Sequence, residues 1–204
     1  IEKIIVSMNI LIQTMVAGSI LPVALHNGQL YFLFGKENPL EDSSKGFSDF
    51  GGKMDEGETP YMAAMREGSE ELTGFLGNKT ELEAFITKNG GVKTIVIETY
   101  HIHIFMMEYD VNLPKYFNQN HSFLWKNMDI QYLNDSKLFE KIEIQWFTPE
   151  MMLARKDEFR NFYQKYVDVL LKDKSDIMKF IKSKSKMLNK VTKMTIKRTK
   201  KQRK

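Results

Sequence analysis

The segment from Gly51 to Phe75 constrains this chain of 204 residues more than any other part of it. It reads GGKMDEGETPYMAAMREGSEELTGF, and its second half is expected to form a helix. On that helix Glu67, Glu70 and Glu71 are spaced i, i+3 and i+4, so their carboxylates share one face. Three like charges on one face are unfavourable unless a cation neutralises them. The oxygen ligands suit a hard divalent ion such as Mg²⁺.

The same segment resembles the Nudix box, whose pattern is G-x5-E-x7-R-E-U-x-E-E-x-G-U, where U is a bulky aliphatic residue. Gly68 stands where the pattern has a bulky residue, and the closing glycine and apolar residue come one position late, as Gly74 and Phe75. The charged positions are intact, while the packing and loop positions differ. The positions that match in register are Gly52, Glu58, Arg66, Glu67, Glu70 and Glu71.

By this resemblance the chain is a metal-dependent hydrolase that splits a diphosphate linkage by attack of water on phosphorus. Metal ions offset phosphate charge and lower the pKa of bound water. The resemblance implies that Arg66 pairs with Glu58 and braces the loop against the helix. Gly51 and Gly52 let the backbone come close to metal or phosphate. The implied ligands of Mg²⁺ or Mn²⁺ are Glu67, Glu70, Glu71 and the carbonyl of Gly52.

The general base has two candidates. Glu71 is one of them. The other is Glu140, because the stretch FEKIEIQWFTPEMM is similar to the segment of eukaryotic mRNA-decapping enzymes that supplies a further catalytic glutamate near a Trp-Phe pair. In that comparison Glu140 matches better than Glu143. The residues expected to act in catalysis are therefore Glu71, Glu140 and, through its support of the site, Arg66.

Positive charge is concentrated at the C-terminal end. Of the 30 Lys and Arg residues, eleven lie in residues 182–204, which contain no acid; the rest of the chain holds 19 basic against 26 acidic residues. Such a tail can neutralise the phosphates of RNA, or it can be a solvated tail without a partner. The candidate RNA-binding residues in it are Lys197, Arg198, Lys200 and Lys201.

The stretch from Asp110 to Glu140 is long for an internal connection and is rich in aromatic residues. Tyr116, Phe123 and Trp125 are candidates for stacking on a nucleobase, and a methylated guanine is well suited because its ring is cationic. The alternative is that these rings anchor a helical insertion to the core.

Several elements can be placed from local signals. Asn27-Gly28 predicts a hairpin between strands at 20–25 and 30–34, and Pro22 favours an edge position or a bulge in the first of them. Residues 35–49 are expected to form a loop. Thr59 and Pro60 predict the start of the glutamate-bearing helix. Further strands are expected at 94–99, 102–109 and 142–147.

Two more helices are expected, one before the strand at 94–99 and one after the strand at 142–147. Thr80 and Glu83 have capping-box spacing, which predicts a helix at 81–88. Apolar and aromatic residues recur at helical spacing between Phe159 and Leu171, which predicts one long amphipathic helix packed on the domain.

These observations predict an α+β fold, a Nudix-type α/β/α sandwich with a mixed sheet, an aromatic-rich insertion and a C-terminal helical extension. The expected organisation is a lead-in at 1–17, the hydrolase domain at 18–154, the amphipathic helix at 155–181 and the basic tail at 182–204. The chain contains no cysteine, which excludes disulfides and thiolate metal sites. The apolar run at 4–25 is interrupted by Asn9, Gln13 and Pro22, so neither a membrane segment nor a signal peptide is expected.

The box indicates the reaction but not the group attached to the diphosphate. The tail, the aromatic stretch and the Trp-Phe segment favour capped mRNA as the partner, with release of methylated guanosine diphosphate. The phrase FSDFGGKMDEGETP also resembles the Nudix enzymes of large DNA viruses, so a cytoplasmic location, in the host if viral, is expected. Two alternatives are open: a hydrolase of diphosphoinositol polyphosphates or dinucleoside polyphosphates, and an RNA-binding module with a weak catalytic centre.

Overall fold

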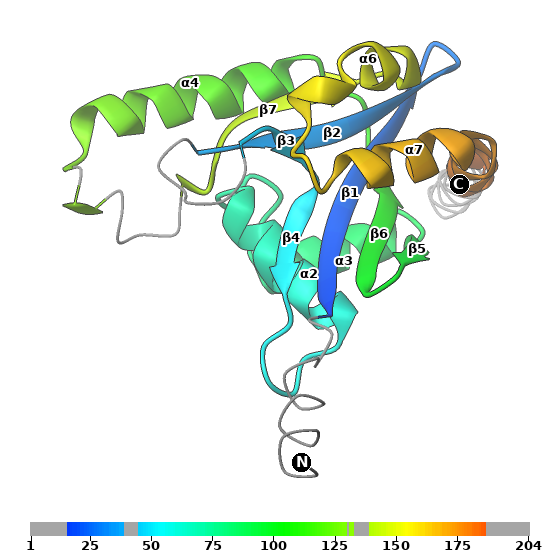
Figure 1. Cartoon of the computed structure of the whole chain (residues 1–204), viewed down its shortest axis with the longest axis horizontal. Coiled ribbons are helices and arrows are strands. Elements are labelled where there is room, and N and C mark those ends of the chain that lie inside the picture. Colours follow the sequence, from blue (N-terminus) through cyan, green and yellow to red (C-terminus); the bar gives the residue numbers. More distant parts are fainter. Residues whose placement is uncertain (1–15, 39–44, 130, 133–138, 187–204) are drawn as a thin grey trace, which may run out of the picture.

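The computed structural model describes residues 16–38, 45–129, 131–132 and 139–186 (Figure 1). Its strands are β1 (Ala17–His26), β2 (Gln29–Glu37), β3 (Phe47–Ser48), β4 (Phe50–Lys53), β5 (Val92–Ile97), β6 (Tyr100–Met106) and β7 (Lys141–Phe147). Its helices are α2 (Pro60–Glu71), α3 (Lys79–Lys88), α4 (Asn112–Asn127), α6 (Pro149–Ala154), the short 3-10 helix η2 (Lys156–Glu158) and α7 (Gln164–Lys172).

The strands form one mixed sheet in the order β3-β2-β1-β6-β5, with β4 paired to β1 and β7 paired to β2. Strand β1 runs parallel to β6 and antiparallel to β2 and β4. Its first half pairs with β4 and its last residues pair with β2, so β1 and β2 diverge. The short strands β3 and β4 fill the fork between them, one on each side.

Of the two predictions for Pro22, an edge position or a bulge, the edge position is wrong, because β1 lies inside the sheet. The proline is accommodated where the ladder changes partner. The carbonyl of Val23 accepts from Met107 on the β6 side, so by alternation the nitrogen of Pro22 faces the opposite side. On that side β4 pairs as far as Ile20 and β2 begins at Val23, so no partner strand requires an N–H from Pro22.

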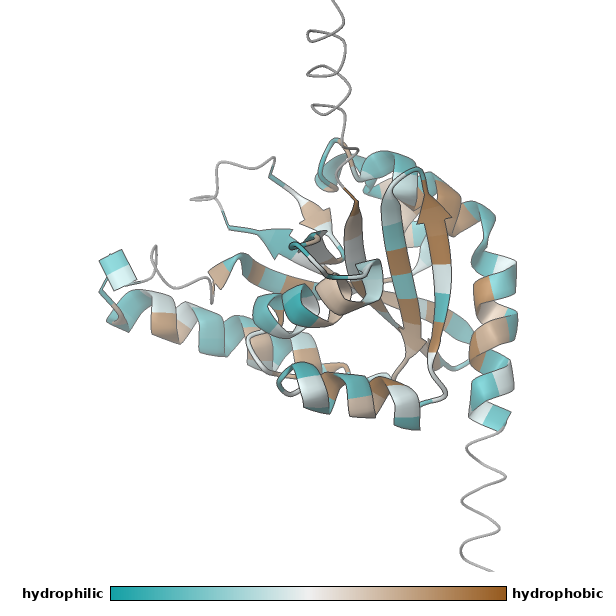
Figure 2. Ribbon diagram, turned by 90° about the horizontal axis from the view of Figure 1, so that it is seen from below, coloured by the Kyte–Doolittle hydropathy of each residue, from teal (hydrophilic) through white to brown (hydrophobic). Residues whose placement is uncertain are grey.

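Helices cover both faces of the sheet (Figure 1). Alternate residues of β1 serve different cores: Leu21 and Val23 pack with α6, α7 and the helical residues after them, whereas Ile20 and Ala24 pack with α2, α3 and α4. Residues 18–24 of β1 are all buried, and Figure 2 shows hydrophobic residues along strands that lie between the helices. This arrangement confirms the predicted α+β sandwich.

The region predicted as a loop at 35–49 contains regular structure. Strand β2 extends to Glu37, and β3 pairs with Gly35 and Lys36. Residues 39–44, in the middle of the predicted loop, lie outside the described residues.

The capping box of α3 lies two residues earlier than predicted. Asn78, not Thr80, is the N-cap: its side chain accepts from the N–H of Glu81, and Glu81 accepts from the N–H of Asn78. Asn78 and Glu81 have the same three-residue spacing as the predicted pair, and Asn is at least as good an N-cap as Thr.

The single long C-terminal helix predicted from the aromatic spacing is also wrong in its extent. Phe159 forms an isolated parallel bridge with Phe47 instead of a helical turn, and α7 begins at Gln164. The helix is interrupted at Asp173, and helical residues resume at 174–186. Apart from the exposed Phe162, the residues that suggested one helix do share one core, but they reach it from the bridge at Phe159, the turn before α7 and α7 itself. Within the described residues, none of the helices has both the length and the apolar character needed to cross a membrane.

Candidate active site

Helix α2 begins where the sequence predicted. Thr59 is its N-cap, and the side-chain oxygen of Thr59 accepts a hydrogen bond of 3.2 Å from the N–H of Met62. Pro60 occupies the first turn, where its missing N–H costs no hydrogen bond. The glutamates of the box therefore lie in the last two turns of a helix that is held firmly at its start.

The three carboxylates differ in exposure. The side chains of Glu67, Glu70 and Glu71 are 17%, 44% and 4% exposed. Glu67 packs against the backbone of β4: a Cβ added to Gly52 would lie 2.5 Å from Glu67 Oε1. The absence of a side chain at Gly52 is what lets the strand and the carboxylate approach each other.

Arg66 connects the helix to the loop before it. Its Nε and one terminal nitrogen donate to the two oxygens of Glu58 at 3.0 and 2.8 Å, a bidentate pair. The same guanidinium donates to the carbonyl of Lys53 at 3.1 Å and to Glu67 at 2.6 Å. Arg66 and Glu58 therefore brace the end of β4 and the following loop against α2.

Glu71 points into the protein. Its Oε2 accepts a hydrogen bond of 2.9 Å from the N–H of Gly51, and its Oε1 lies 3.2 Å from the ammonium of Lys141. Burial raises the pKa of Glu71 well above its usual range, and the charge of Lys141 opposes that rise. Burial alone would lower the pKa of Lys141, but the charges of Glu71 and Glu37 outweigh it, so that pKa is raised.

The donors fit a hard divalent ion by their chemistry, since they are carboxylate oxygens and a glycine carbonyl on facing elements. The described side chains do not converge on one point, and among the described residues no three His, Cys, Asp or Glu side chains form a metal-binding group. Glu67 is turned to Arg66 and Glu71 to Lys141. An ion would therefore be held after the carboxylate of Glu67 turns away from Arg66.

A family model described as the NUDIX domain matches residues 17–168, most of the chain. The chain belongs to the Nudix family. It is accordingly a Nudix hydrolase, an assignment consistent with hydrolysis of a diphosphate linkage, and enzymes of this family typically use divalent metal ions.

Two solved structures and one viral protein are similar to this Nudix chain. The Nudix hydrolase RenU from M. smegmatis has 15% identity and a TM-score of 0.46, covering 80% of this chain and 88% of that one. The C. elegans Ap4A hydrolase has 13% identity and a TM-score of 0.45, covering 80% and 98%. Uncharacterized protein L534 of Acanthamoeba polyphaga mimivirus is 42% identical over 59 residues, 28% of this chain. The match spans only 19% of the viral protein's length.

Glu140 lies close enough to Glu71 for its charge to contribute to the raised pKa of Glu71. It is half-buried, immediately before β7, and its carbonyl accepts from the N–H of Asn38. Glu143, the weaker candidate in the sequence, lies on β7 and forms a half-exposed ion pair of 3.8 Å with Lys36. The structure therefore brings both general-base candidates, Glu71 and Glu140, to one end of the sheet.

The aromatic candidates lie on or near α4. Tyr116 and Phe123 are 57% and 64% exposed. Trp125 is only half-exposed, with its ring edge-on to that of Phe139 at 6.3 Å. The tail candidates Lys197, Arg198, Lys200 and Lys201 lie outside the described residues.

Sequence reasoning missed a second buried carboxylate beside the box, Asp49. It lies in the fork between β3 and β4, where it accepts hydrogen bonds from Ser19 at 2.5 Å and Tyr100 at 2.6 Å. Burial raises its pKa to about 6, against the effect of these two hydrogen bonds. The Ser-Asp-Phe-Gly-Gly string places an acid two residues before the box glycines, but nothing in it indicates burial.

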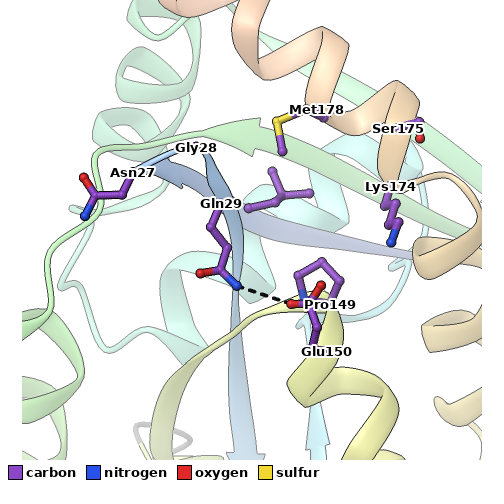
Figure 3. A pocket seen from close by; sticks show the side chains of 9 residues that line it. Asn27, Gly28, Gln29, Pro149, Glu150, Lys174, Ser175 and Met178 are labelled. Carbon is purple, nitrogen blue, oxygen red and sulfur yellow. Dashed lines mark hydrogen bonds between the residues drawn. The ribbon is translucent and has the colours of Figure 1, made fainter.

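A cavity of about 420 Å³ lies at the hairpin end of β1, between that hairpin, α6 and the helical residues after α7 (Figure 3). Gln29 and Glu150 form a hydrogen bond of 3.3 Å on its wall. The box glycines pair with the opposite end of β1, at Gly18 and Ser19. The cavity is therefore separate from the candidate active site.

The Arg66–Glu58 pair makes a pH-dependent contribution to stability. The hydrogen bonds from Arg66 lower the pKa of Glu58 from 4.5 to about 2. A carboxyl whose pKa is depressed on folding stabilises the fold fully above its unfolded pKa and loses that contribution as pH falls through the folded value. We therefore expect the difference in melting temperature between the parent and Glu58→Gln to be constant above about pH 5 and to shrink between pH 4.5 and 2. Thermal unfolding of both proteins across pH 2–7 measures it, and parallel curves would contradict the assignment.

Proposed function

We propose that this Nudix hydrolase, acting with Mg²⁺ or Mn²⁺, is an mRNA-decapping enzyme that releases methylated guanosine diphosphate from capped RNA. The observation that carries the proposal is a pair of exposed aromatic side chains, Tyr116 and Phe123, on a helix anchored to the strand that starts beside Glu71. The tail of residues 182–204 is assigned to the phosphates of the RNA body in this proposal.

The anchoring of α4 is specific. The side chain of Asn118 accepts from the N–H of Ile144 at 2.9 Å and donates to the carbonyl of Ile144 at 3.3 Å, so α4 is fixed to β7. Phe117 is buried against the core on the inner side of the helix. Tyr116 and Phe123 are seven residues apart, two turns along the outer side, about 10 Å by helix rise. Figure 1 shows α4 running alongside β7.

The carboxylates of the site are expected to have two roles, binding a metal ion and accepting a proton from water. When bound, a divalent ion lowers the pKa of water and offsets the charge of the phosphates. Glu67, Glu70, Glu71 and the carbonyl of Gly52 would hold it, and Arg66 keeps Glu67 and the preceding loop in place. Either Glu71 or Glu140 would accept the proton from the attacking water, since both lie at this end of the sheet.

The deciding experiment is release of label from cap-labelled RNA by the purified protein in Mg²⁺ or Mn²⁺, with Glu71→Gln as the inactive control. Release of methylated guanosine diphosphate by the parent alone is the expected result. No release, together with hydrolysis of diphosphoinositol or dinucleoside polyphosphates offered in parallel, would keep the Nudix chemistry and remove the RNA substrate. RNA binding without hydrolysis of any of these substrates would favour a binding module.

Removing the two exposed rings tests the role given to α4. Stacking of a base on an aromatic side chain contributes about 1–3 kcal/mol, so Tyr116→Ala and Phe123→Ala are each expected to raise KM for capped RNA by about 5- to 150-fold. The value of kcat at saturation and the melting temperature should change little, because both side chains are exposed. Leu153→Ala, which truncates a side chain that is 67% exposed on α6, is the matched control. Parental KM values in both ring variants would show that these rings do not contact the substrate.

A further inference from the structure

A buried lysine outside the box is held directly behind Glu71. Lys141, the first residue of β7, is 1% exposed. Its ammonium donates to Glu37 Oε1 and to Ser48 Oγ at 3.0 Å, and it lies 3.2 Å from Glu71 Oε1. An ammonium has three N–H donors, and each of these has an acceptor here.

The fold makes room for this lysine. A Cβ added to Gly35 would lie 2.9 and 3.0 Å from Cγ and Cδ of Lys141, so the aliphatic part of the lysine passes across β2 at its glycine. Glu37 and Lys141 are opposite each other in the β2–β7 ladder, after an irregularity in the register between Lys36 and Glu37. Such an irregularity re-aims the side chains beside it, here turning Glu37 toward the interior.

The lysine is not needed merely to neutralise Glu37. Arg160 donates to the same oxygen of Glu37 at 2.6 Å, so that carboxylate already has a cationic partner. Two cations therefore contact Glu37, and Lys141 is the one of them that also lies against Glu71. With the N–H of Gly51 on Oε2 and the ammonium on Oε1, both oxygens of Glu71 are fixed from the protein side.

We propose that Lys141 is a positioning residue that orients the carboxylate of Glu71 for the metal ion, with Glu37 and Ser48 as its anchors. The proposal rests on the metal-dependent hydrolysis proposed above and adds a residue that the box does not contain. Groups that orient a metal ligand without touching the metal typically affect metal affinity or activity by about 10- to 100-fold. A ligand held in its productive geometry does not have to be reorganised when the ion binds.

The test is Mn²⁺ affinity, measured by electron paramagnetic resonance or calorimetry without substrate. Lys141→Met alone leaves two carboxylates against one arginine in the interior and could unfold the protein. The main variant is therefore Lys141→Met with Glu37→Gln, which removes one buried charge of each sign. Lys156→Met is the matched control, because Lys156 has an exposed ion pair of 2.6 Å with Asp168. Ser48→Ala is a milder variant that removes one anchor and keeps every charge.

We expect the double variant to bind Mn²⁺ about 10- to 100-fold more weakly than the parent, Ser48→Ala to shift affinity less in the same direction, and Lys156→Met to behave as the parent. The change should appear in kcat more than in KM for any diphosphate substrate. Unchanged or tighter Mn²⁺ binding in the double variant, or, if that variant does not fold, in Ser48→Ala, would overturn the proposal. A parent whose Mn²⁺ binding is absent, or is not weakened by Glu71→Gln, would instead overturn the metal assignment, and the role of Lys141 with it.

Discussion

Glu71→Gln is expected to reduce the rate of diphosphate hydrolysis by about 10³-fold. The amide keeps an oxygen for the N–H of Gly51 but loses the negative charge that a divalent ion requires. Charge stabilisation through a bound ion is worth several kcal/mol, and about 4 kcal/mol corresponds to a factor of 10³ in rate. Single-turnover hydrolysis of a diphosphate substrate in saturating Mg²⁺ measures the effect. A variant that cleaves at the parental rate would remove Glu71 from the metal site.

The structure also predicts a loss of stability for this variant, which the box alone does not suggest. Glu71 is a buried carboxylate paired with Lys141, whereas the other acidic partner of Lys141, Glu37, is also paired with Arg160. Removing its charge leaves one uncompensated cation in the interior, and breaking a buried pair in this way costs about 3–5 kcal/mol. Urea unfolding should show this loss, so the rate must be measured where the variant is fully folded. Glu158→Gln, which breaks only a surface pair with Arg155, should leave both rate and stability near parental values.

The parts of the site that the sequence could predict are those fixed by local geometry. Helical periodicity alone places Glu67, Glu70 and Glu71 on one face, and the cap at Thr59 sets where the helix starts. The Arg66–Glu58 pair spans eight residues, so the register of the box was enough to indicate it.

Lys141 and Glu37 could not be predicted in the same way, because 104 residues separate them and they meet only through the β2–β7 ladder. Polar and apolar residues alternate along the first half of β7, so Lys141 falls on the same face as Glu143 and Gln145. That pattern predicts an exposed lysine side chain. The register irregularity that turns Glu37 inward has no signature in the sequence. Nor does the sequence indicate that Gly35 leaves the space through which the side chain of Lys141 passes.

Two departures from the box pattern, Gly68 and the late Gly74, are explained by neighbouring residues in the structure. A Cβ on Gly68 would lie 2.4 Å from Cδ1 of Ile20, so the side chain of Ile20 fills the space that the family's bulky residue would need. The delayed glycine reflects the way α2 ends. Thr73 and Gly74 both have positive φ, 49° and 73°, and the N–H of Gly74 bonds to the carbonyl of Ser69. The longer turn needs its glycine one position later.

Changing the two adjacent box glycines to alanine is expected to have different effects: Gly51→Ala should lower stability, and Gly52→Ala should weaken Mg²⁺ binding. A Cβ on Gly51 would lie 2.4 Å from both the carbonyl oxygen of Gly18 and Cα of Ser19, which are backbone atoms of the central strand β1. Backbone at the centre of a sheet cannot move aside cheaply, so Gly51→Ala should lose about 3 kcal/mol of unfolding free energy. The shift of β4 would also break the hydrogen bond from Gly51 to Glu71. Urea unfolding and yield of soluble protein measure this loss.

Gly52→Ala meets a different neighbour. Its Cβ would lie 2.5 Å from Oε1 of Glu67, the end of a flexible side chain that can turn away. The fold should therefore remain within about 1 kcal/mol of the parent, because alanine also restricts the unfolded chain. The displaced carboxylate leaves the carbonyl of Gly52, so the Mg²⁺ concentration for half-maximal activity should rise about 10- to 100-fold. A Mg²⁺ titration at fixed substrate separates the two glycines: an unstable Gly52→Ala with parental Mg²⁺ dependence would mean that Gly52 shapes the sheet and not the metal site. Gly51 contacts β1, so its lack of a side chain is needed for the sheet to form. Gly52 contacts Glu67, so its lack of a side chain is needed for the metal site.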